Sequence, residues 1–193
     1  MNKKILVSAF GPFGSEGYNP SEKLLGNLSG DIIKIILPVT YSGAAERLKS
    51  AISEHHPDFV ICLGLAGGRS EVCLEACALN VMDASIPDNA GYLACGEPFV
   101  PGSENARFTS LPLRNILSKV KAAGIPCRIS YHAGTYVCNS TYYTLLESGT
   151  PGCFIHIPYD EKSVEGKRGD TPFIKLSDSA LAVSTVIDFL KEL

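Results

Sequence analysis

The sequence predicts an α/β fold, a three-layer α/β/α sandwich with a mainly parallel central sheet. Three observations predict it. Short apolar runs typical of buried strands occur along the chain, stretches of helical period lie between them, and 45% of the 193 residues are apolar. That content is enough for one sizeable core, so we expect a single domain over residues 1–193.

Five apolar runs predict the strands of this sheet. Each run is rich in β-branched or aromatic residues and ends at a Gly, a Pro or a polar residue, as buried strands do. The runs are residues 5–9, 32–37, 59–63, 127–131 and 153–157. Because such sheets bind their ligands at the carboxyl ends of the strands, the residues after these runs are the first candidates for a site.

Stretches between and after these runs predict helices that pack on the sheet. Apolar residues recur at helical spacing in residues 44–52, 113–120 and 183–193. Pro112 and Gly124 mark the two ends of the second helix, and Ser177 is the candidate N-cap of the last. Residues 137–147 can form a further helix.

The segment from Glu75 to Asn105 fits this alternation poorly. It carries Asp, Asn, Pro and Gly at many positions, and these residues favour turns. Residues 75–82 have the apolar content of an extended strand, and we expect a long loop after them. A loop of that length in a compact domain is usually functional.

The composition argues against several classes of partner. Seventeen basic and twenty acidic residues give a formal net charge of -3, and no Lys/Arg block exceeds a pair, so we expect no nucleic-acid partner. The chain has no run of about 18 apolar residues that could span a membrane. The apolar run that ends at Phe10 is too short for a secretion signal. We therefore expect no membrane partner.

The cysteines indicate a reducing compartment and no metal site. There are seven, an odd number, and several lie within apolar runs, where a thiol behaves as a small hydrophobe. We therefore expect a cytoplasmic protein. Cys73 and Cys77 are a close pair without the matching His or second pair of a zinc site, so we expect no metal.

Cys138 differs from the other cysteines in its place along the chain. It follows the fourth predicted strand and begins the possible helix 137–147. At a helix N-terminus, the macrodipole and free N–H groups favour a thiolate and can also bind an oxyanion. This placement predicts a nucleophile. The alternative is a buried structural thiol in a non-catalytic α/β module that binds a small molecule or a partner protein.

A nucleophilic cysteine needs a base and a group that orients the base. His55 and His56 end the first predicted helix and are poor candidates. His132 and His156 lie at or near strand ends, and spacing alone does not choose between them. Of the carboxylates after the third strand, Glu75 is expected to be the least exposed and is the candidate for orienting the imidazole.

The loop Phe10-Gly-Pro-Phe-Gly, followed by Asn19-Pro20, lies at the carboxyl end of the first strand. It lacks the Gly-Lys-Ser/Thr of a phosphate-binding loop and the three-glycine dinucleotide fingerprint. Phe10 and Phe13 can instead form apolar walls of a pocket, with Asn19 as a hydrogen-bonding group. The alternative is that these aromatic rings only cap the core.

Five stretches together resemble the pyroglutamyl peptidases (pyrrolidone carboxyl peptidases), a family of cysteine peptidases. They are residues 9–14 with Asn19-Pro20, 64–80, 86–89, 133–139 and 154–158, in the family's order and rough spacing. The resemblance implies a triad of Cys138 as nucleophile, His156 as base and Glu75 as orienting acid. The pocket residues that it implies are Phe10, Phe13, Asn19, Leu65, Ile86, Tyr136 and Val137, with Leu65 contributing through its backbone.

The resemblance also implies an activity, which is the removal of N-terminal pyroglutamate from peptides through an acyl-enzyme intermediate. Members of the family use no cofactor or metal and often form dimers or tetramers. This chain has Leu65, Ser85 and Tyr136 where many bacterial members have Gln, Arg and Phe. These departures leave open a cysteine amidase that acts on a different small amide.

Overall fold

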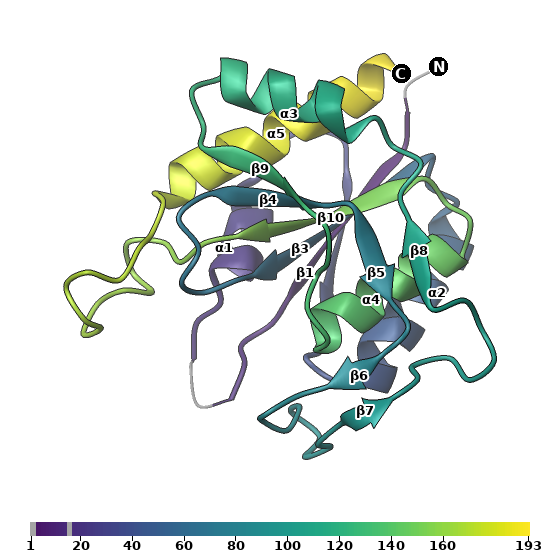
Figure 1. The fold of residues 1–193 in the computed structure, drawn as a ribbon. Helices are drawn as coiled ribbons and strands as arrows, with labels where there is room; N and C mark the ends of the chain where they lie inside the picture. Colours follow the sequence, from purple (N-terminus) through teal and green to yellow (C-terminus); the bar gives the residue numbers. More distant parts are fainter. Residues whose placement is uncertain (1–2, 15–16) are drawn as a thin grey trace.

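The computed structural model describes residues 3–14 and 17–193 and has the α/β sandwich that the sequence predicts (Figure 1). In chain order, the elements are β1 (Ile5–Phe10), α1 (Pro20–Asn27), β2 (Ile33–Leu37), α2 (Tyr41–His55), β3 (Phe59–Leu65), β4 (Val72–Glu75), β5 (Cys77–Leu79), β6 (Met82–Asp83), β7 (Cys95–Glu97), β8 (Ala106–Phe108), α3 (Leu113–Ala122), β9 (Cys127–Ser130), α4 (Val137–Glu147), β10 (Gly152–Ile157) and α5 (Leu176–Glu192). The five apolar runs form β1, β2, β3, β9 and β10. Within the described ranges, no helix combines the length and the hydropathy needed to cross a membrane.

The central sheet has six strands in the order β2-β1-β3-β10-β4-β9. Every neighbouring pair is parallel except β10 and β4, so the sheet is mainly parallel, as predicted. Strand β4 is reversed because only residues 66–71 separate it from β3, whereas a parallel return needs a crossover of about a dozen residues or more. The reversal places Glu75 opposite Phe154 of β10.

Helices cover both faces of this sheet (Figure 1). The apolar side chains of α1, α3 and α5 share one buried cluster with alternate strand residues such as Ile5 and Val7. The side chains of α2 and α4 share a second cluster, on the other face, with the strand residues between them, such as Leu6. The carboxyl ends of the parallel strands β1, β2, β3 and β10 meet at one edge of the sheet, where a site is expected.

Helix α1 is not predicted by apolar periodicity, because its eight residues give too few repeats. Its start nevertheless follows the rules for a helix N-terminus. The Asn19 side chain caps the helix by accepting a hydrogen bond from the Ser21 N–H at 3.0 Å, and Pro20 takes the first helical position.

The start of α5 corrects one prediction. Ser177 is not the N-cap, because Lys175 holds the cap position and the helix begins at Leu176. The carboxylate of Glu161, in the preceding loop, accepts the Leu176 N–H at 2.8 Å. A carboxylate fifteen residues earlier in the chain therefore does what a local hydroxyl was expected to do.

The segment after β4 differs in part from its prediction. A continuous strand over 75–82 is wrong, because β4 ends at Glu75 and the chain leaves the central sheet at Ala76. The Ala76 N–H donates to the Ser130 carbonyl oxygen at 2.7 Å, and the Ala76 carbonyl accepts from Thr109 at 3.1 Å. Strand β5, within the predicted strand, pairs with β8, which follows Asn105, and β6 pairs with β7; the expected long loop therefore lies between strands of two small antiparallel sheets.

Candidate active site

Cys138 lies in the first turn of α4, and the helix predicted over residues 137–147 is confirmed. Tyr136 holds the N-cap position. The buried Asn139 side chain accepts the Leu79 N–H at 2.8 Å and donates to the Leu79 carbonyl oxygen at 2.8 Å. These two bonds attach the first turn of α4 to β5, and they thereby fix the backbone from which the Cys138 side chain projects.

The sulfur of Cys138 lies over β3. A Cβ atom added to Gly64 would lie 3.0 Å from Cys138 Sγ and 2.7 Å from the Phe154 ring, so sulfur and ring fill the space above this glycine. Gly64 pairs in register with His156 of β10. Because neighbouring strands lie about 4.8 Å apart, the sulfur and the imidazole occupy adjacent places on the sheet.

His156 and Glu75 form a buried pair. The distance between His156 Nδ1 and Glu75 Oε1 is 2.7 Å, and Arg69 Nη1 donates to the same oxygen at 2.8 Å. The Glu75 side chain is 0% exposed and the His156 side chain 5%. Among the carboxylates between β3 and β7, Glu75 is the least exposed, as predicted.

The pKa shifts leave Glu75 ionised and His156 neutral at pH 7. Burial alone would raise the pKa of Glu75, but hydrogen bonds from His156, Ser130 and Arg69 lower this pKa below its usual value. Burial lowers the pKa of His156; the Glu75 carboxylate opposes this shift in part, and the charge of Arg69 adds to it. Because the Glu75 carboxylate accepts at Nδ1, that nitrogen carries the imidazole proton, and Nε2 can accept another.

Burial favours the thiol form of Cys138 in the free protein and opposes the thiolate that its place at a helix N-terminus predicts. Burial raises the pKa of Cys138 from 9.0 to about 12, and the charge of Glu75 adds to the rise. The dipole of α4 opposes burial, but a helix dipole contributes at most about 2 kcal/mol, or about 1.5 pKa units, which is smaller than the rise. The thiol therefore needs a proton acceptor when it reacts, and a neutral imidazole is in the right state.

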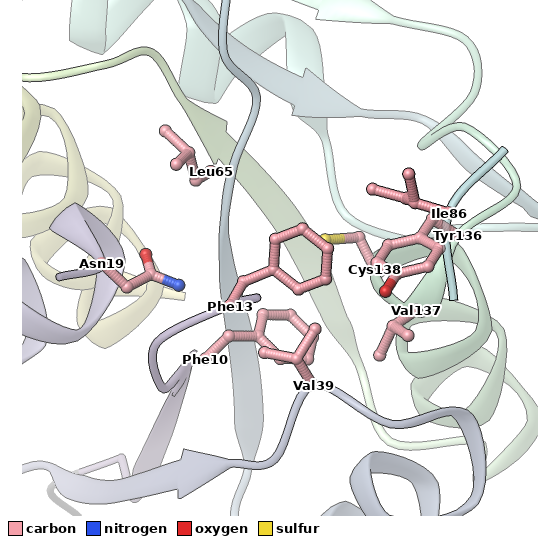
Figure 2. A pocket seen from close by; sticks show the side chains of 9 residues that line it. All are labelled: Phe10, Phe13, Asn19, Val39, Leu65, Ile86, Tyr136, Val137 and Cys138. Carbon is pink, nitrogen blue, oxygen red and sulfur yellow. The ribbon is translucent and has the colours of Figure 1, made fainter. Parts of the chain in front are cut away.

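A cavity of about 190 Å³ opens beside Cys138 (Figure 2). It is lined by Phe10, Phe13, Asn19, Val39, Leu65, Ile86, Tyr136, Val137 and Cys138. Every pocket residue implied by the resemblance is among them (Figure 2). None of the nine carries a charge, so the cavity suits an uncharged ligand.

Comparison with known proteins identifies the family. A family model described as pyroglutamyl peptidase matches residues 3–192. The chain belongs to the pyroglutamyl peptidase family. A pyrrolidone-carboxylate peptidase of Bacillus velezensis is 37% identical over 198 residues, covering 96% of this chain and 92% of that protein. One from Thermococcus kodakarensis is 42% identical over 175 residues, covering 85% of each chain.

Solved structures of family members have the same fold. The crystal structure of the pyroglutamyl peptidase I from Bacillus amyloliquefaciens matches with a TM-score of 0.91 at 36% identity, covering 96% of this chain and 93% of that chain. A mutant pyrrolidone carboxyl peptidase from Pyrococcus furiosus matches with a TM-score of 0.92 at 37% identity, covering 98% and 99% of the two chains. The fold predicted from the sequence is therefore confirmed.

Aromatic rings form one wall of the cavity in this pyroglutamyl peptidase family member. The centroids of the Phe13 and Tyr136 rings are 5.6 Å apart in an edge-to-face contact, and the Tyr41 ring contacts Tyr136 at the same distance. The Tyr136 hydroxyl donates to the Pro87 carbonyl oxygen at 3.0 Å. A phenylalanine at this position would lack that bond, so the hydroxyl adds a link between the cavity wall and the loop before Asp88.

Asn19 lines the cavity, but most of its hydrogen-bonding capacity is already used. Its Oδ1 accepts from the N–H and the hydroxyl of Ser21, and its Nδ2 donates to the Gly11 carbonyl oxygen at 2.8 Å. One Nδ2 hydrogen is left for a ligand. Asn19 therefore mainly connects the Phe10–Phe13 loop to the start of α1.

Two residues of the site have no counterpart in the sequence reasoning. Val39 lines the cavity and follows β2 by two residues, so the rule that ligands bind at strand ends could have found it. Arg69 contacts Glu75 from the turn before β4. The contact between Arg69 and Glu75 could not be found from their spacing in the sequence, because it depends on the turn that reverses the chain before β4.

His132 does not join the cluster. It is exposed, and its Nδ1 accepts the Gly134 N–H at 3.2 Å in its own turn. Within residues 3–14 and 17–193, no group of three or more His, Cys, Asp or Glu side chains could hold a metal ion. Of the candidate triad, Cys138 lines the cavity, while His156 and Glu75 lie beside it in the sheet and Arg69 bonds to Glu75.

Proposed function

We propose that this chain removes N-terminal pyroglutamate from peptides, with Cys138 as nucleophile, His156 as base and then acid, and Glu75 as the orienting carboxylate. The observation that carries the proposal is the buried Glu75–His156 pair, with Nδ1 and Oε1 2.7 Å apart, one strand away from a thiol at the edge of an apolar cavity. Membership of the pyroglutamyl peptidase family supports the same activity.

In the first half of the reaction, His156 Nε2 takes the Cys138 proton as the sulfur attacks the carbonyl carbon that joins pyroglutamate to the next residue. The first backbone hydrogen bond of α4 runs from the main-chain N–H of Asn139 to the Tyr136 carbonyl oxygen at 2.9 Å. The N–H groups of Val137 and Cys138 come before it in the helix. These early N–H groups of the helix hold the oxyanion of the tetrahedral intermediate.

In the second half, the protonated imidazole gives its proton to the leaving amine, and the peptide departs. A thioester then joins the pyroglutamyl group to Cys138. Water attacks this thioester while His156 takes a proton from the water, and the proton returns to sulfur as pyroglutamate is released. The Glu75 carboxylate stabilises the imidazolium in both halves without accepting the proton itself.

The cavity suits the pyroglutamyl ring. A lactam has no charged α-amine, so its site needs no carboxylate, and none of the nine lining residues is charged. At about 190 Å³ the cavity is smaller than the roughly 300–1,000 Å³ of sites for drug-sized ligands, as expected for one small ring. The rings of Phe13 and Tyr136 supply flat apolar walls, and polar contacts at the rim fix the orientation of the lactam.

Hydrolysis of a pyroglutamyl anilide tests the proposal. We expect Cys138→Ser and His156→Ala to lose about 1,000-fold or more in kcat/KM, because each removes a group that takes part in bond formation or proton transfer. The matched control is His132→Ala, which removes an exposed imidazole and should stay within about twofold of the wild type. An inert wild type, or an active Cys138→Ser variant, would show that the proposal is wrong.

A second substrate separates this activity from that of a cysteine amidase with a different preference. Prolyl anilide has the same ring without the lactam carbonyl and carries a charged amine, which an uncharged cavity disfavours. We expect kcat/KM for the pyroglutamyl compound to be at least about 100-fold higher. Equal rates on the two anilides would favour the amidase.

We also propose a cytoplasmic location and a homo-oligomer. A nucleophilic thiol stays usable only where it is kept reduced, which favours the cytoplasm. Phe108 and Tyr131 are 68% and 66% exposed and line one shallow hollow beside β8 and β9, which favours contact with another copy. Sedimentation velocity tests the second part, and a monomer at micromolar concentration would contradict it.

A further inference from the structure

Arg69 contacts the candidate triad from outside the cavity. Its Nη1 donates at 2.8 Å to Glu75 Oε1, the oxygen that also accepts from His156 Nδ1. The other oxygen, Oε2, is buried and has no hydrogen-bond partner among the described residues. The hydroxyl of Ser130, the β9 residue that pairs with Glu75, donates to the His132 carbonyl oxygen at 3.2 Å and also contributes to lowering the pKa of Glu75. His156 and Arg69 both bond to Oε1, and together they orient the carboxylate.

The turn that carries Arg69 is itself held in place. The Arg69 N–H bonds to the Ala66 carbonyl at 3.4 Å, and Gly68 between them has a φ of +83°, which favours glycine. The Ala66 N–H donates to the Ile157 carbonyl oxygen at 2.8 Å, next to His156 in β10. The turn is thus anchored to the strand that carries the imidazole.

Close packing completes this support. A Cβ atom added to Gly67 would lie 2.4 Å from the Tyr159 ring, so the turn lies flat against that ring. The Arg69 side chain is 24% exposed, while its partner Glu75 is 0% exposed. The guanidinium therefore reaches inward from the surface to a carboxylate that water does not reach.

We propose that Arg69 is a positioning residue of the reaction: it holds Oε1 of Glu75 where that oxygen orients the His156 imidazole. This inference rests on the proposed function. It is distinct from the triad, because Arg69 neither lines the cavity nor meets the substrate. It also gives a role to the Gly-Gly-Arg stretch that precedes Glu75 in the sequence.

The charge of Arg69 gives the proposal a measurable consequence at His156. The groups that face His156 are Glu75 and Cys73 from β4, Cys138 from α4, and Arg69 from the turn before β4. Burial lowers the pKa of His156, Glu75 opposes that shift, and the charge of Arg69 adds to it. Removing the positive charge therefore raises the pKa of His156, and the imidazole becomes protonated at a higher pH.

The test compares Arg69→Met and Arg69→Lys with Arg128→Met. Arg128 is the matched control, because it pairs with Glu71 at 3.3 Å on the same part of the sheet but does not touch Glu75. For each variant, kcat and KM on pyroglutamyl anilide are measured across pH, together with thermal unfolding. The pH at which His156 titrates is followed separately by NMR of the imidazole, which needs no substrate.

We expect Arg69→Met to lose about tenfold or more in kcat, with little change in KM, because a hydrogen bond to a charged group that orients the base is lost. The acid limb of its rate profile and the His156 titration should both move to higher pH. Arg69→Lys keeps the charge but not the planar fork, so the titration should stay in place while kcat recovers in part. Arg128→Met should match the wild type in all three measurements.

Three results would overturn the inference. They are a folded Arg69→Met variant with an unmoved His156 titration, an Arg69→Met loss that Arg128→Met reproduces, and an Arg69→Lys variant whose titration moves. If the Met variant does not fold, Arg69→Lys decides. If the wild type does not hydrolyse the anilide, the proposed function fails, while the NMR titration still decides whether Arg69 controls His156.

Discussion

Gly64 shows how closely the residues around Cys138 are fitted. We expect Gly64→Ala to reduce kcat/KM by about 100-fold, because the new methyl group would lie 3.0 Å from Sγ and 2.7 Å from the Phe154 ring and must displace one of them. The control is Gly26→Ala, where a Cβ meets nothing within 4 Å. Steady-state kinetics on pyroglutamyl anilide measures both variants. Equal activity of Gly64→Ala and Gly26→Ala would show that Gly64 does not confine the sulfur of Cys138.

Glu75 allows a second test on a single residue. In Glu75→Gln, the carboxylate that opposes the effect of burial on His156 is gone, so the pKa of His156 falls further and the acid limb of the rate profile moves to lower pH. The rate itself should fall by about 1,000-fold or more, because an amide does not fix the same tautomer. A profile that moves to higher pH would contradict the assigned protonation states.

At the scale of elements, two loops are joined beside the cavity. The Asn89 side chain accepts the Gly14 N–H at 3.1 Å and donates to the Pro12 carbonyl oxygen at 3.0 Å, so it holds the loop that carries Phe13. We expect Asn89→Ala to raise KM several-fold with little change in kcat, because the wall of the pocket loosens while the triad stays in place. Asn89→Asp keeps the acceptor, so its KM should lie between those of the wild type and Asn89→Ala. A change confined to kcat would contradict this role.

The elements that follow from local pattern could be predicted, and those set by long-range contacts could not. The buried runs such as 153–157 and the helix over 137–147 are signalled by their own residues. The break at Ala76 depends on its bond to Ser130, and the pairing partner of β4 is β10; both lie far along the chain. The Glu161 carboxylate that replaces the expected cap of α5 is a third case.

The candidate site divides in the same way. Cys138 and Glu75 could be chosen from their positions in predicted elements, but the choice of His156 over His132 came from the family resemblance. Its physical basis is that β10 is central in the sheet, whereas His132 lies in an exposed turn after an edge strand. The contact with Arg69 is a consequence of topology, and sequence spacing carries no sign of it.

At the scale of the whole molecule, the buried pair makes stability depend on pH. The folded-state pKa of Glu75 lies below its usual 4.5, so its contribution is present above that pH and is lost as the pH falls through the folded-state value. The folded-state pKa of His156 also lies below its usual 6.5, so the unfolded chain gains a proton first as the pH falls. Both lowered pKa values therefore make the folded chain less stable as the pH falls.

We therefore expect the free energy of unfolding to fall as the pH drops from about 6.5 toward 4. Urea unfolding at several pH values measures this, and His156→Gln should flatten the upper part of the curve because a group whose pKa is lower in the folded chain than in the unfolded chain is removed. Stability that rises on acidification would contradict the assigned shifts. A single unfolding transition in the same data would support the proposal of one domain over residues 1–193.

The most direct test of the central claim is covalent labelling with a pyroglutamyl chloromethyl ketone, followed by mass-spectrometric mapping of the modified residue. The ketone enters the cavity as a substrate would and alkylates the group that attacks the scissile carbonyl. The proposal predicts one label per chain, on Cys138, with activity lost in proportion to labelling and with free pyroglutamate protecting the enzyme. Activity lost through a label on another residue, or full activity with Cys138 labelled, would contradict it.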